Sequence, residues 1–596
     1  MTAAVVLAVL LLTPSGEPGA LVGPIAGTAP SAVRNAGSLE AQSRTRRART
    51  KRPTTRRVRA TKAVAPVPMG WTSPRGTAEL AADFANMINN RVRGGRFGVM
   101  VVSLTRGDTV FAHDAGAMMQ PASTMKLYST AAALDRFGPE HTFSTDVLRD
   151  SASAPGGVVA GNLYLRGDGD PSMSSRFWKD PNYPMTTLAR SIASAGVKHV
   201  KGDLIYDASA FDDQKIPDGW KTKYLGAAYA ARVTALSLNE NVMWVAVRPE
   251  GSSARVELEP ASSAVPLTNN VRVVRGSGGR IVARQTGDGI MVTGTIGANR
   301  GPLRYSLVVP DPAQCPAGAL HAALEEAGIT VDGAVKAGKT PGAAVRVASF
   351  GSPPLSQIIS DMNRESINIV AELLFRDAAR ASAPGGMSSA DAGLANLREF
   401  ISKRVGADPA QINVSDGSGL STLDSLTPRN MVHLLSYAHR GPWSSAFHGS
   451  LPVAGESELL RRRMRSTPAQ GNLHAKTGTT DTVIGLGGYV TAKDGEIMAF
   501  SFLYNGRDRW NAKSTMDAMG ATRQFDLIDR YDEQHGISAM MRTTGYSLSI
   551  TGQMQVRGEV TPPGVWTPDE CMPAAAYIAE LRKRGMNVIE SEKVRK

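Results

Sequence analysis

The sequence Pro121-Ala122-Ser123-Thr124-Met125-Lys126 places a lysine three positions after a serine. Helical spacing brings positions i and i+3 onto one face, so a helix that begins near Ala122 lets the Lys126 amine reach the Ser123 hydroxyl. A serine hydroxyl is a poor nucleophile without a base, and a lysine acts as a base only when burial or a second cation lowers its pKa. Alone, the same residues also describe an ordinary helix start with a surface lysine.

A second short element, Ser366-Ile367-Asn368, lies 240 positions after Lys126 and precedes an apolar helical stretch. As an isolated triplet it also fits the N-cap of a helix. In an acyl-transfer site, Ser366 would relay a proton to the leaving amine and Asn368 would position the substrate amide. Whether the triplet is catalytic therefore depends on the elements that precede and follow it in the sequence.

The third element, Lys476-Thr477-Gly478-Thr479, closes a predicted strand. Lys476 is the expected second cation beside Lys126, and together with the neighbouring hydroxyls it can hold a substrate carboxylate. Gly478 leaves room for a substrate backbone to lie along the strand. A strand end with turn residues is the alternative for this element in isolation.

The order of the three elements is more informative than any one of them. Ser-x-x-Lys, a middle triplet with outer Ser and Asn, and Lys-Thr-Gly succeed one another in active-site-serine, penicillin-reactive enzymes. We therefore predict a catalytic site composed of Ser123, Lys126, Ser366, Asn368 and Lys476, with substrate binding by Thr477, Gly478 and Thr479.

Hydrophobic periodicity divides the chain around these elements. A helix is expected over Thr77 to Val92 and a hairpin over Arg96 to Asp114, whereas short alternating runs with Gly- and Asn-rich turns fill the segment from about Phe143 to Val345. Helical periodicity returns at Leu355 to Ala379 and at Ser388 to Arg404, and a β meander closes the pattern. The patterns predict a discontinuous catalytic domain, 76–145 and 346–522, interrupted by a mostly β insertion of two subdomains, 146–345.

At this point the chain closely resembles the class C low-molecular-mass penicillin-binding proteins, the D-alanyl-D-alanine carboxypeptidase/endopeptidase family. The resemblance covers roughly Thr77 to Ala521, and the long insertion between the first two elements is the family's distinguishing feature. Four further segments carry it: Gly161-Asn162-Leu163-Tyr164-Leu165-Arg166-Gly167-Asp168-Gly169-Asp170-Pro171, Ala235-Leu236-Ser237-Leu238-Asn239-Glu240-Asn241, Asp416-Gly417-Ser418-Gly419-Leu420-Ser421 and Leu451-Pro452-Val453-Ala454-Gly455.

The resemblance implies an α/β fold, a transpeptidase-like or β-lactamase-like domain in which helices flank an antiparallel sheet, with a large, mostly β insertion. It also implies that Ser123 attacks the D-Ala-D-Ala carbonyl of peptidoglycan stem peptides and forms an acyl-enzyme that water resolves. The backbone N–H groups of Ser123 and Thr479 would form the oxyanion hole. Penicillins would acylate the same serine and inhibit the enzyme.

Two departures from the family pattern concern the substrate. The family often has Arg after Asp-Gly-Ser-Gly-Leu-Ser, whereas Thr422 follows here. It also tends to carry an acid shortly after the Gly-Trp of the insertion, whereas Trp220 is followed by Lys221, Thr222 and Lys223. Both changes bear on how the side chain of the peptide stem is held, and neither touches the residues of acylation.

The N-terminal segment accounts for most of the formal charge of +14. Residues Arg44 to Lys62 hold ten Lys or Arg and no acid, which leaves +4 for the rest of the chain. This composition predicts a disordered basic linker over 31–75, with electrostatic contact to anionic wall polymer or membrane as the alternative, and no nucleic-acid partner. The apolar run Met1 to Leu12 predicts an export signal within 1–30, with a frayed apolar N-terminus as the alternative. Export would place the protein in the periplasm or at the outer face of the cytoplasmic membrane or cell wall.

The other ionisable residues suggest no cofactor and no metal. Nine histidines occur without a His-Glu-x-x-His arrangement, and the cysteines Cys315 and Cys571 are far apart. The C-terminal segment, 523–596, resembles the end of saccharopine reductases in Phe525 to Glu533, Met541 to Tyr546 and Gly564 to Pro568. It lacks a Gly-x-Gly-x-x-Gly after a strand, so we expect a remnant without nicotinamide chemistry.

Three functions are open to the chain on the sequence alone. The leading one is a serine-type D-Ala-D-Ala carboxypeptidase or endopeptidase. A β-lactamase or esterase would instead deacylate penicillin fast and release no D-Ala, and a non-catalytic scaffold would bind peptidoglycan without turnover.

Overall fold

A computed structural model of the chain describes residues 76–521, except 151, 152, 155, 288, 381–385, 493 and 494. It also describes short parts of the C-terminal segment, namely 524–528, 549–551, 553–557, 573–584 and 587–591. The expected export signal and basic linker lie outside the described residues, as does Cys571.

The central sheet has five antiparallel strands in the order β2-β1-β22-β21-β20. Strands from both sides of the insertion meet in it, since Phe97 lies opposite Tyr504. Both faces of β21 and β22 are buried, which explains why these strands are nearly continuous apolar runs. The bounds are β1 Arg96–Ser103, β2 Thr109–His113, β20 His474–Thr479, β21 Val483–Thr491 and β22 Ile497–Asn505.

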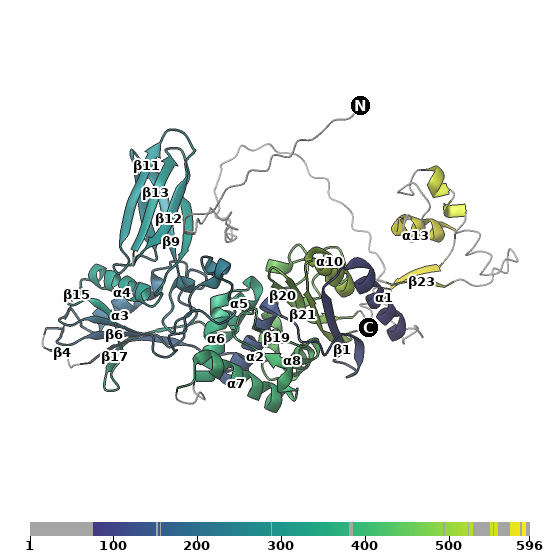
Figure 1. Cartoon of the computed structure of the whole chain (residues 1–596), viewed down its shortest axis with the longest axis horizontal. Coiled ribbons are helices and arrows are strands. Elements are labelled where there is room, and N and C mark those ends of the chain that lie inside the picture. Colours follow the sequence, from purple (N-terminus) through teal and green to yellow (C-terminus); the bar gives the residue numbers. More distant parts are fainter. Residues whose placement is uncertain are drawn as a thin grey trace, which may run out of the picture.

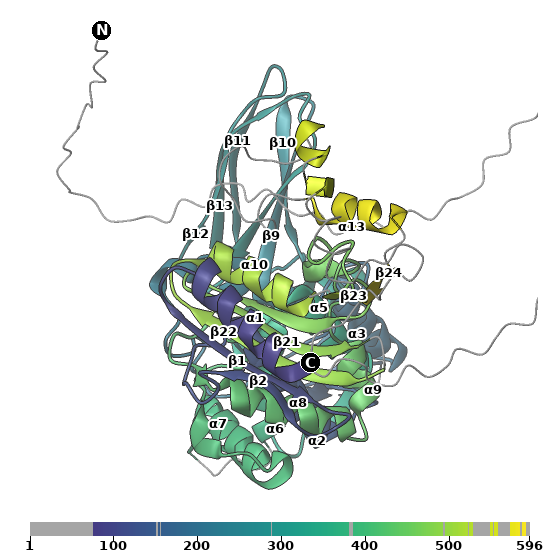
Figure 2. The same cartoon turned by 90° about the vertical axis from the view of Figure 1, so that its right-hand side faces the viewer.

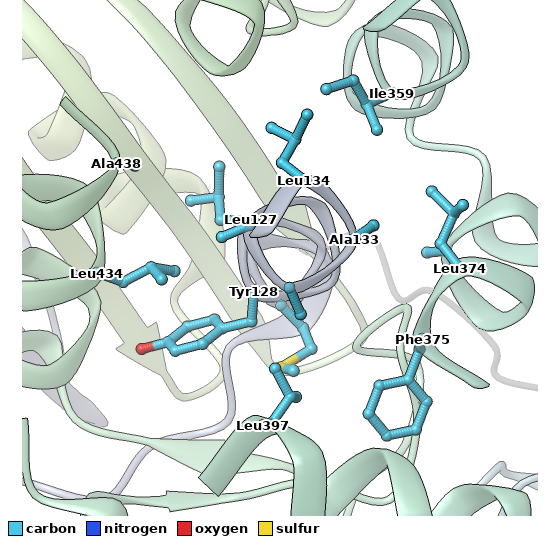
Figure 3. Packing of buried hydrophobic residues seen from close by; sticks show 14 of the residues in the cluster. Leu127, Tyr128, Ala133, Leu134, Ile359, Leu374, Phe375, Leu397, Leu434 and Ala438 are labelled. Carbon is cyan, nitrogen blue, oxygen red and sulfur yellow. The ribbon is translucent and has the colours of Figure 1, made fainter. Parts of the chain in front are cut away.

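Helices cover both faces of this sheet. Figure 2 shows α1 (Gly76–Arg91) and α10 (Arg509–Gly520) lying across one face, where Phe84 and Met516 enter a shared apolar core. The other face is covered by a helical layer built around α2 (Lys126–Phe137), which is buried along most of its length. Figure 3 shows side chains of α2 surrounded by apolar residues of four helices, α5 Leu355–Glu365, α6 Asn368–Arg380, α7 Ser389–Phe400 and α8 Pro428–Arg440.

One helical stretch expected from periodicity, Leu355 to Ala379, is two helices. The chain leaves α5 at Ser366, whose left-handed φ of 62° ends the helix, and α6 starts two residues later at Asn368. A residue in this conformation commonly closes a helix because it turns the backbone out of the helical path. Ser366 therefore caps the C-terminus of one helix instead of the N-terminus of the next.

The insertion contains three sheets and two helices that the alternating pattern did not indicate, α3 (Tyr183–Ser194) and α4 (Gln314–Glu326). A five-stranded sheet of order β16-β8-β6-β3-β17 and a four-stranded sheet of order β15-β7-β5-β4 share one core with these helices. The bounds are β3 Ser144–Arg149, β4 Ser153–Ala154, β5 Val158–Val159, β6 Leu163–Arg166, β7 His199–Val200, β8 Leu204–Asp207, β15 Thr330–Val331, β16 Val335–Ala337 and β17 Val345–Gly351.

The third sheet of the insertion has six strands in the order β12-β13-β11-β10-β9-β14 and its own apolar core. Figure 1 shows it projecting away from the rest of the molecule. Its strands are β9 Val242–Glu250, β10 Ser253–Glu259, β11 Leu267–Val274, β12 Ile281–Thr286, β13 Gly289–Gly297 and β14 Leu303–Val308. The expected class, an antiparallel sheet flanked by helices with a large β-rich insertion, is confirmed, whereas the exact domain bounds stay a prediction.

Smaller elements complete the described part of the chain. Strands β18 (Ile412–Asn413) and β19 (Ser425–Leu426) pair with each other, and α9 (Ser444–Gly449) follows α8. In the C-terminal segment, β23 (Gln524–Ile528) pairs antiparallel with β24 (Asn587–Ser591), and α13 spans Ala574–Lys583. No helix among the described residues is both long and apolar enough to cross a membrane.

Candidate active site

Ser123 lies in a 3-10 turn, η1 (Ala122–Met125), directly before α2, and not in the first turn of the α-helix itself. Two glycines let other backbone segments approach this turn. A Cβ on Gly478 of β20 would lie 2.7 Å from the carbonyl oxygen of Pro121, and one on Gly419 would lie 1.9 Å from that of Ala122. Real Cβ atoms do not make such contacts with backbone, so both positions require glycine. The close approach holds Ser123 against the edge of the sheet.

The Lys126 amine lies at the centre of the site and is fully buried. Its Nζ is 3.1 Å from Ser123 Oγ, 2.7 Å from Asn368 Oδ1 and 2.8 Å from the carbonyl oxygen of Ser418. Asn368 is oriented by its other end, because its Nδ2 donates to the carbonyl of Tyr229 at 2.8 Å. The amide oxygen of Asn368 therefore faces the lysine.

These contacts restrict how a neutral Lys126 can bond. A neutral amine has two N–H groups and one lone pair, and the two carbonyl-type oxygens of Asn368 and Ser418 can only accept. Both N–H groups are then engaged, and the lone pair faces the Ser123 hydroxyl. Burial lowers the pKa of Lys126 to about 8, against the opposing pull of Asp416, Glu372 and Asp424. The geometry and the pKa together suit proton abstraction from Ser123 near neutral pH.

Lys476 and Ser366 form the second half of the site. Lys476 is fully buried on β20, and its Nζ donates to Ser366 Oγ at 2.9 Å and to the carbonyl of Thr477 at 2.9 Å. Burial, and then the charge of Lys126, hold the pKa of Lys476 well below its usual range. The alternative for the isolated triplet is that Ser366 serves only as a helix N-cap. This alternative is excluded, because the Ser366 hydroxyl accepts a hydrogen bond from Lys476 and the residue ends α5.

Three buried carboxyl groups, those of Glu372, Asp416 and Asp424, lie near Lys126. Asp416 accepts from the backbone N–H groups of Ser418 (3.0 Å), Gly419 (2.6 Å) and Ser421 (2.6 Å), and Glu372 accepts from those of Gly417 (3.1 Å) and Ser418 (2.9 Å). Both acids therefore fix the loop whose Ser418 carbonyl binds Lys126. Burial, and then Asp416, raise the pKa of Glu372 to about 8 and the pKa of Asp424 well above its usual range.

The insertion takes part directly in the site. Besides the Tyr229 carbonyl, it supplies the indole of Trp220, whose Nε1 donates to Asp416 Oδ2 at 2.7 Å. Gly219 and Thr422 join the two parts of the chain through a backbone hydrogen bond of 3.1 Å and a side-chain bond of 3.0 Å. Thr422, which replaces the Arg usual in the family, thus closes the loop onto the insertion.

The two lysines that follow Trp220 form ion pairs with the carboxylate of Asp481. Lys221 and Lys223 lie 3.3 and 2.6 Å from Asp481, and the Tyr224 hydroxyl donates to the same carboxylate at 2.5 Å. Lys223 and Tyr224 hold the pKa of Asp481 far below its usual range. Lys221 and Tyr224 also line a shallow surface hollow beside Ala122 and Thr480.

The five residues predicted to be catalytic therefore form two hydrogen-bonded groups, Ser123–Lys126–Asn368 and Ser366–Lys476, which lie close enough for the charge of Lys126 to lower the pKa of Lys476. The three predicted for substrate binding follow Lys476 along β20, which forms the outer edge of the central sheet. Sequence reasoning missed the Ser418 and Tyr229 carbonyls and the acids Glu372, Asp416 and Asp424 as parts of the site. The Asp-Gly-Ser-Gly run, quoted only for its family resemblance, could have indicated a tight loop, but no sequence signal marks a backbone carbonyl of the insertion.

No group of three or more His, Cys, Asp or Glu arranged to hold a metal ion occurs among the described residues. Cys315 is a buried free thiol, and its burial raises its pKa to about 12.

A serine on a turn beside a buried lysine, next to an edge strand with Lys-Thr-Gly, defines a serine acyl-transfer enzyme of the penicillin-binding class. The chain belongs to the D-Ala-D-Ala carboxypeptidase 3 (S13) family, whose family model matches residues 80–524. It is 35% identical over 449 residues to a D-alanyl-D-alanine carboxypeptidase of Actinomadura sp. strain R39, covering 72% of this chain and 81% of that protein. The chain is accordingly a serine-type D-alanyl-D-alanine carboxypeptidase.

Solved structures agree on the fold. Penicillin binding protein 4 (dacB) of Haemophilus influenzae superimposes with a TM-score of 0.60 at 22% identity, over 71% of this chain and 93% of that chain. The same protein complexed with a β-lactam gives a TM-score of 0.56 at 22% identity, with the same two shares covered.

A second family model, the saccharopine dehydrogenase C-terminal domain, matches residues 486–586. This confirms the likeness of the C-terminal segment, although the match starts earlier than the expected boundary near 523. Residues 486–520 belong structurally to the central sheet and to α10, since β21 and β22 pair along their whole length. The two family matches therefore overlap over the last strands of the sheet.

Proposed function

We propose that Ser123 is the nucleophile that attacks the D-Ala-D-Ala carbonyl of peptidoglycan stem peptides. Lys126 takes the Ser123 proton, Oγ forms a bond to the carbonyl carbon, and the peptide bond to the terminal D-Ala breaks. The observation that carries this proposal is the bonding of Lys126, whose two N–H groups have fixed acceptors, so that its lone pair is directed at the Ser123 hydroxyl.

The edge strand β20 supports the choice of a peptide substrate. An edge strand has unpaired backbone groups, and an extended peptide can add to it through main-chain hydrogen bonds. Gly478 brings that edge to Ser123, and Lys476, Thr477 and Thr479 belong to the same strand. We assign these groups to the substrate backbone and its terminal carboxylate, and the N–H groups of Ser123 and Thr479 to the oxyanion.

Ser366 and Asn368 complete the reaction. The Lys476–Ser366 hydrogen bond provides a route by which a proton reaches the nitrogen of the departing D-Ala. Asn368 holds Lys126 with its oxygen, and the second N–H of its amide contacts a substrate carbonyl. Water then attacks the ester carbonyl, Ser123 regains its proton, and the shortened stem leaves.

We also propose that the enzyme acts outside the cytoplasm. A carboxypeptidase of this family acts on peptidoglycan, which lies outside the cytoplasm, so we infer export and a basic linker that contacts the anionic wall or membrane. The β-lactam complex of the Haemophilus influenzae relative supports inhibition of this chain by penicillins through Ser123.

Mass spectrometry of the purified chain tests the proposed function. Brief incubation with penicillin is expected to add the mass of one intact drug molecule to the peptide that contains Ser123. Incubation with purified muropeptides is expected to release free D-Ala from pentapeptide stems, and any cleaved cross-links would show endopeptidase action in the same spectra. An adduct without D-Ala release and with fast deacylation would indicate a β-lactamase, and unchanged stems without an adduct would indicate a scaffold.

The pH dependence of acylation is expected to report on Lys126. The amine must be neutral to accept a proton, so the acylation rate should rise with pH through about 8, the pKa of Lys126. Asp416→Asn removes the carboxylate that most strongly raises this pKa, so the rise should move to lower pH by about one unit. Stopped-flow acylation by a chromogenic cephalosporin between pH 5 and about 10 measures the shift.

Asp424→Asn is the matched control for this shift. Of the three acids that raise the pKa of Lys126, Asp424 has the smallest effect, and burial raises its own pKa and disfavours its charged form, so its replacement by a neutral amide should move the rise far less than Asp416→Asn does. Its profile should keep the rise at about pH 8. Equal shifts in both variants would show that loop distortion, and not the charge of Asp416, sets the pH dependence.

A further inference from the structure

The outer face of the projecting six-stranded sheet has an uneven charge. The inner face packs Val245, Ile281 and Val292 into an apolar core, so alternate residues of each strand point to solvent. Between Pro260 and Pro310 the sequence contains six arginines, no lysine and a single acid, Asp288, which lies outside the described residues. The net charge of the chain outside its basic linker is only +4, so it does not reveal this local excess of positive charge.

One half of the outer face is electrically balanced. On β9, β10 and β14, three arginines pair with three glutamates: Arg248 with Glu257 at 3.6 Å, Arg255 with Glu257 at 2.7 Å and with Glu250 at 3.7 Å, and Arg304 with Glu259. These arginines already have anionic partners within the sheet.

The other half, on β11, β12 and β13, contains arginines with no such partners. Arg272 lies opposite Thr295 and Arg284 lies opposite Met291, and the Arg280 carbonyl accepts from Thr295 N–H at 2.9 Å. All three arginines are exposed, and none forms an ion pair with a described acid. Arg275 and Arg300, in the loops at the same end of the sheet, are also exposed.

The spacing of these arginines suits a chain of repeated anions. Arg272 and Arg280 are separated by one strand, so their Cα atoms lie about 10 Å apart, and Arg280 and Arg284 lie about 13 Å apart along β12. The residues between them include Thr293 and Asn270, whose side chains can donate hydrogen bonds, and the apolar side chains Val282 and Met291, which are partly buried. Guanidinium groups bind phosphate through paired N–H donors.

We propose that this outer half-sheet, defined by Arg272, Arg280 and Arg284 with Arg275 and Arg300 beside them, binds a linear polymer with repeating phosphate groups. The choice of a polymer of the cell wall rests on the proposed function, because such a polymer would hold the enzyme close to its peptidoglycan substrate. The binding itself does not depend on hydrolysis.

Binding of full-length protein to long-chain inorganic polyphosphate, measured over a series of salt concentrations, tests the proposal. The triple variant Arg272→Gln, Arg280→Gln, Arg284→Gln is expected to raise Kd at least roughly tenfold at low salt and to reduce the slope of log K against log salt by about two. The matched control is Arg248→Gln, Arg255→Gln, Arg304→Gln, which removes the same charge from the paired half. Its Kd should rise clearly less than that of the first triple variant, because the arginines it removes are already bound to glutamates and are not free to bind phosphate.

The basic linker is present in both variants, so it contributes equally to both. Equal losses in the two triple variants, or no loss in either, would overturn the proposal. Tighter binding of phosphatidylglycerol vesicles or of double-stranded DNA than of polyphosphate, through the same three arginines, would overturn the choice of partner. Penicillin labelling of Ser123 reports separately on the proposed function, so failure of one is not failure of the other.

Discussion

Ser123→Ala is expected to abolish covalent labelling by penicillin and to lower the release of D-Ala from pentapeptide stems at least about a thousandfold. Alanine lacks the oxygen that forms the acyl bond, while the turn and its close contacts with Gly419 and Gly478 remain. Lys126 keeps both of its acceptor partners, Asn368 and Ser418. A fluorescent penicillin on denaturing gels and an enzymatic assay of free D-Ala measure the two losses.

A remote serine provides the control for this variant. Ser436 lies on α8, and its hydroxyl donates to the Val432 carbonyl within the same helix. Ser436→Ala should label and turn over like the parent. Labelling that persists in Ser123→Ala would place the nucleophile elsewhere and would contradict the proposed function.

Lys126→Met is expected to slow acylation by roughly 10²- to 10⁴-fold, the range of a lost general base. Methionine has a similar length and no ionisable group, so it fills the buried space of Lys126 without accepting a proton. The variant should fold but lose some stability, because methionine fills the buried space yet leaves the oxygens of Asn368 and Ser418 without their donor. Single-turnover acylation by a chromogenic cephalosporin gives the rate, and thermal unfolding confirms the fold.

The variant Lys126→Arg tests whether Lys126 acts as a general base or only through its positive charge. Arginine keeps a cation at this position but does not deprotonate in proteins, so its acylation should be as slow as that of Lys126→Met. Near-parent acylation by the arginine variant would show that Lys126 acts through its positive charge and that another group takes the Ser123 proton.

Local patterns predicted the parts of the fold that depend on near neighbours in the sequence. The hairpin from Arg96, the last two strands of the sheet and the helix after Ser123 follow from alternation, from helical spacing and from Gly138, which ends the helix. The break at Ser366 was not predicted, because a left-handed residue between two apolar helical stretches leaves the hydrophobic periodicity nearly unchanged.

Side chains with distinctive chemistry were also predictable, whereas backbone contributions were not. Lys126 and Lys476 stand in short motifs whose residue types suit proton transfer and carboxylate binding. The carbonyls of Ser418 and Tyr229 have no residue signature, since every residue carries one. The balance of charge among Glu372, Asp416 and Asp424 depends on burial and mutual distance, which no local pattern records.

The sequence by itself determined the reaction class, because a serine, two lysines and an asparagine in three ordered elements carry the chemistry wherever they fold. Only the tertiary structure decided that the pKa of Lys126 falls to about 8 and that its lone pair is directed at Ser123. It also separated the paired from the unpaired arginines on one sheet of the insertion. The physical reason is the same in each case: pKa values, hydrogen-bond directions and ion pairs depend on groups that folding brings together, such as Arg304 and Glu259, which are 45 residues apart, and Lys126 and Asn368, which are 242 apart.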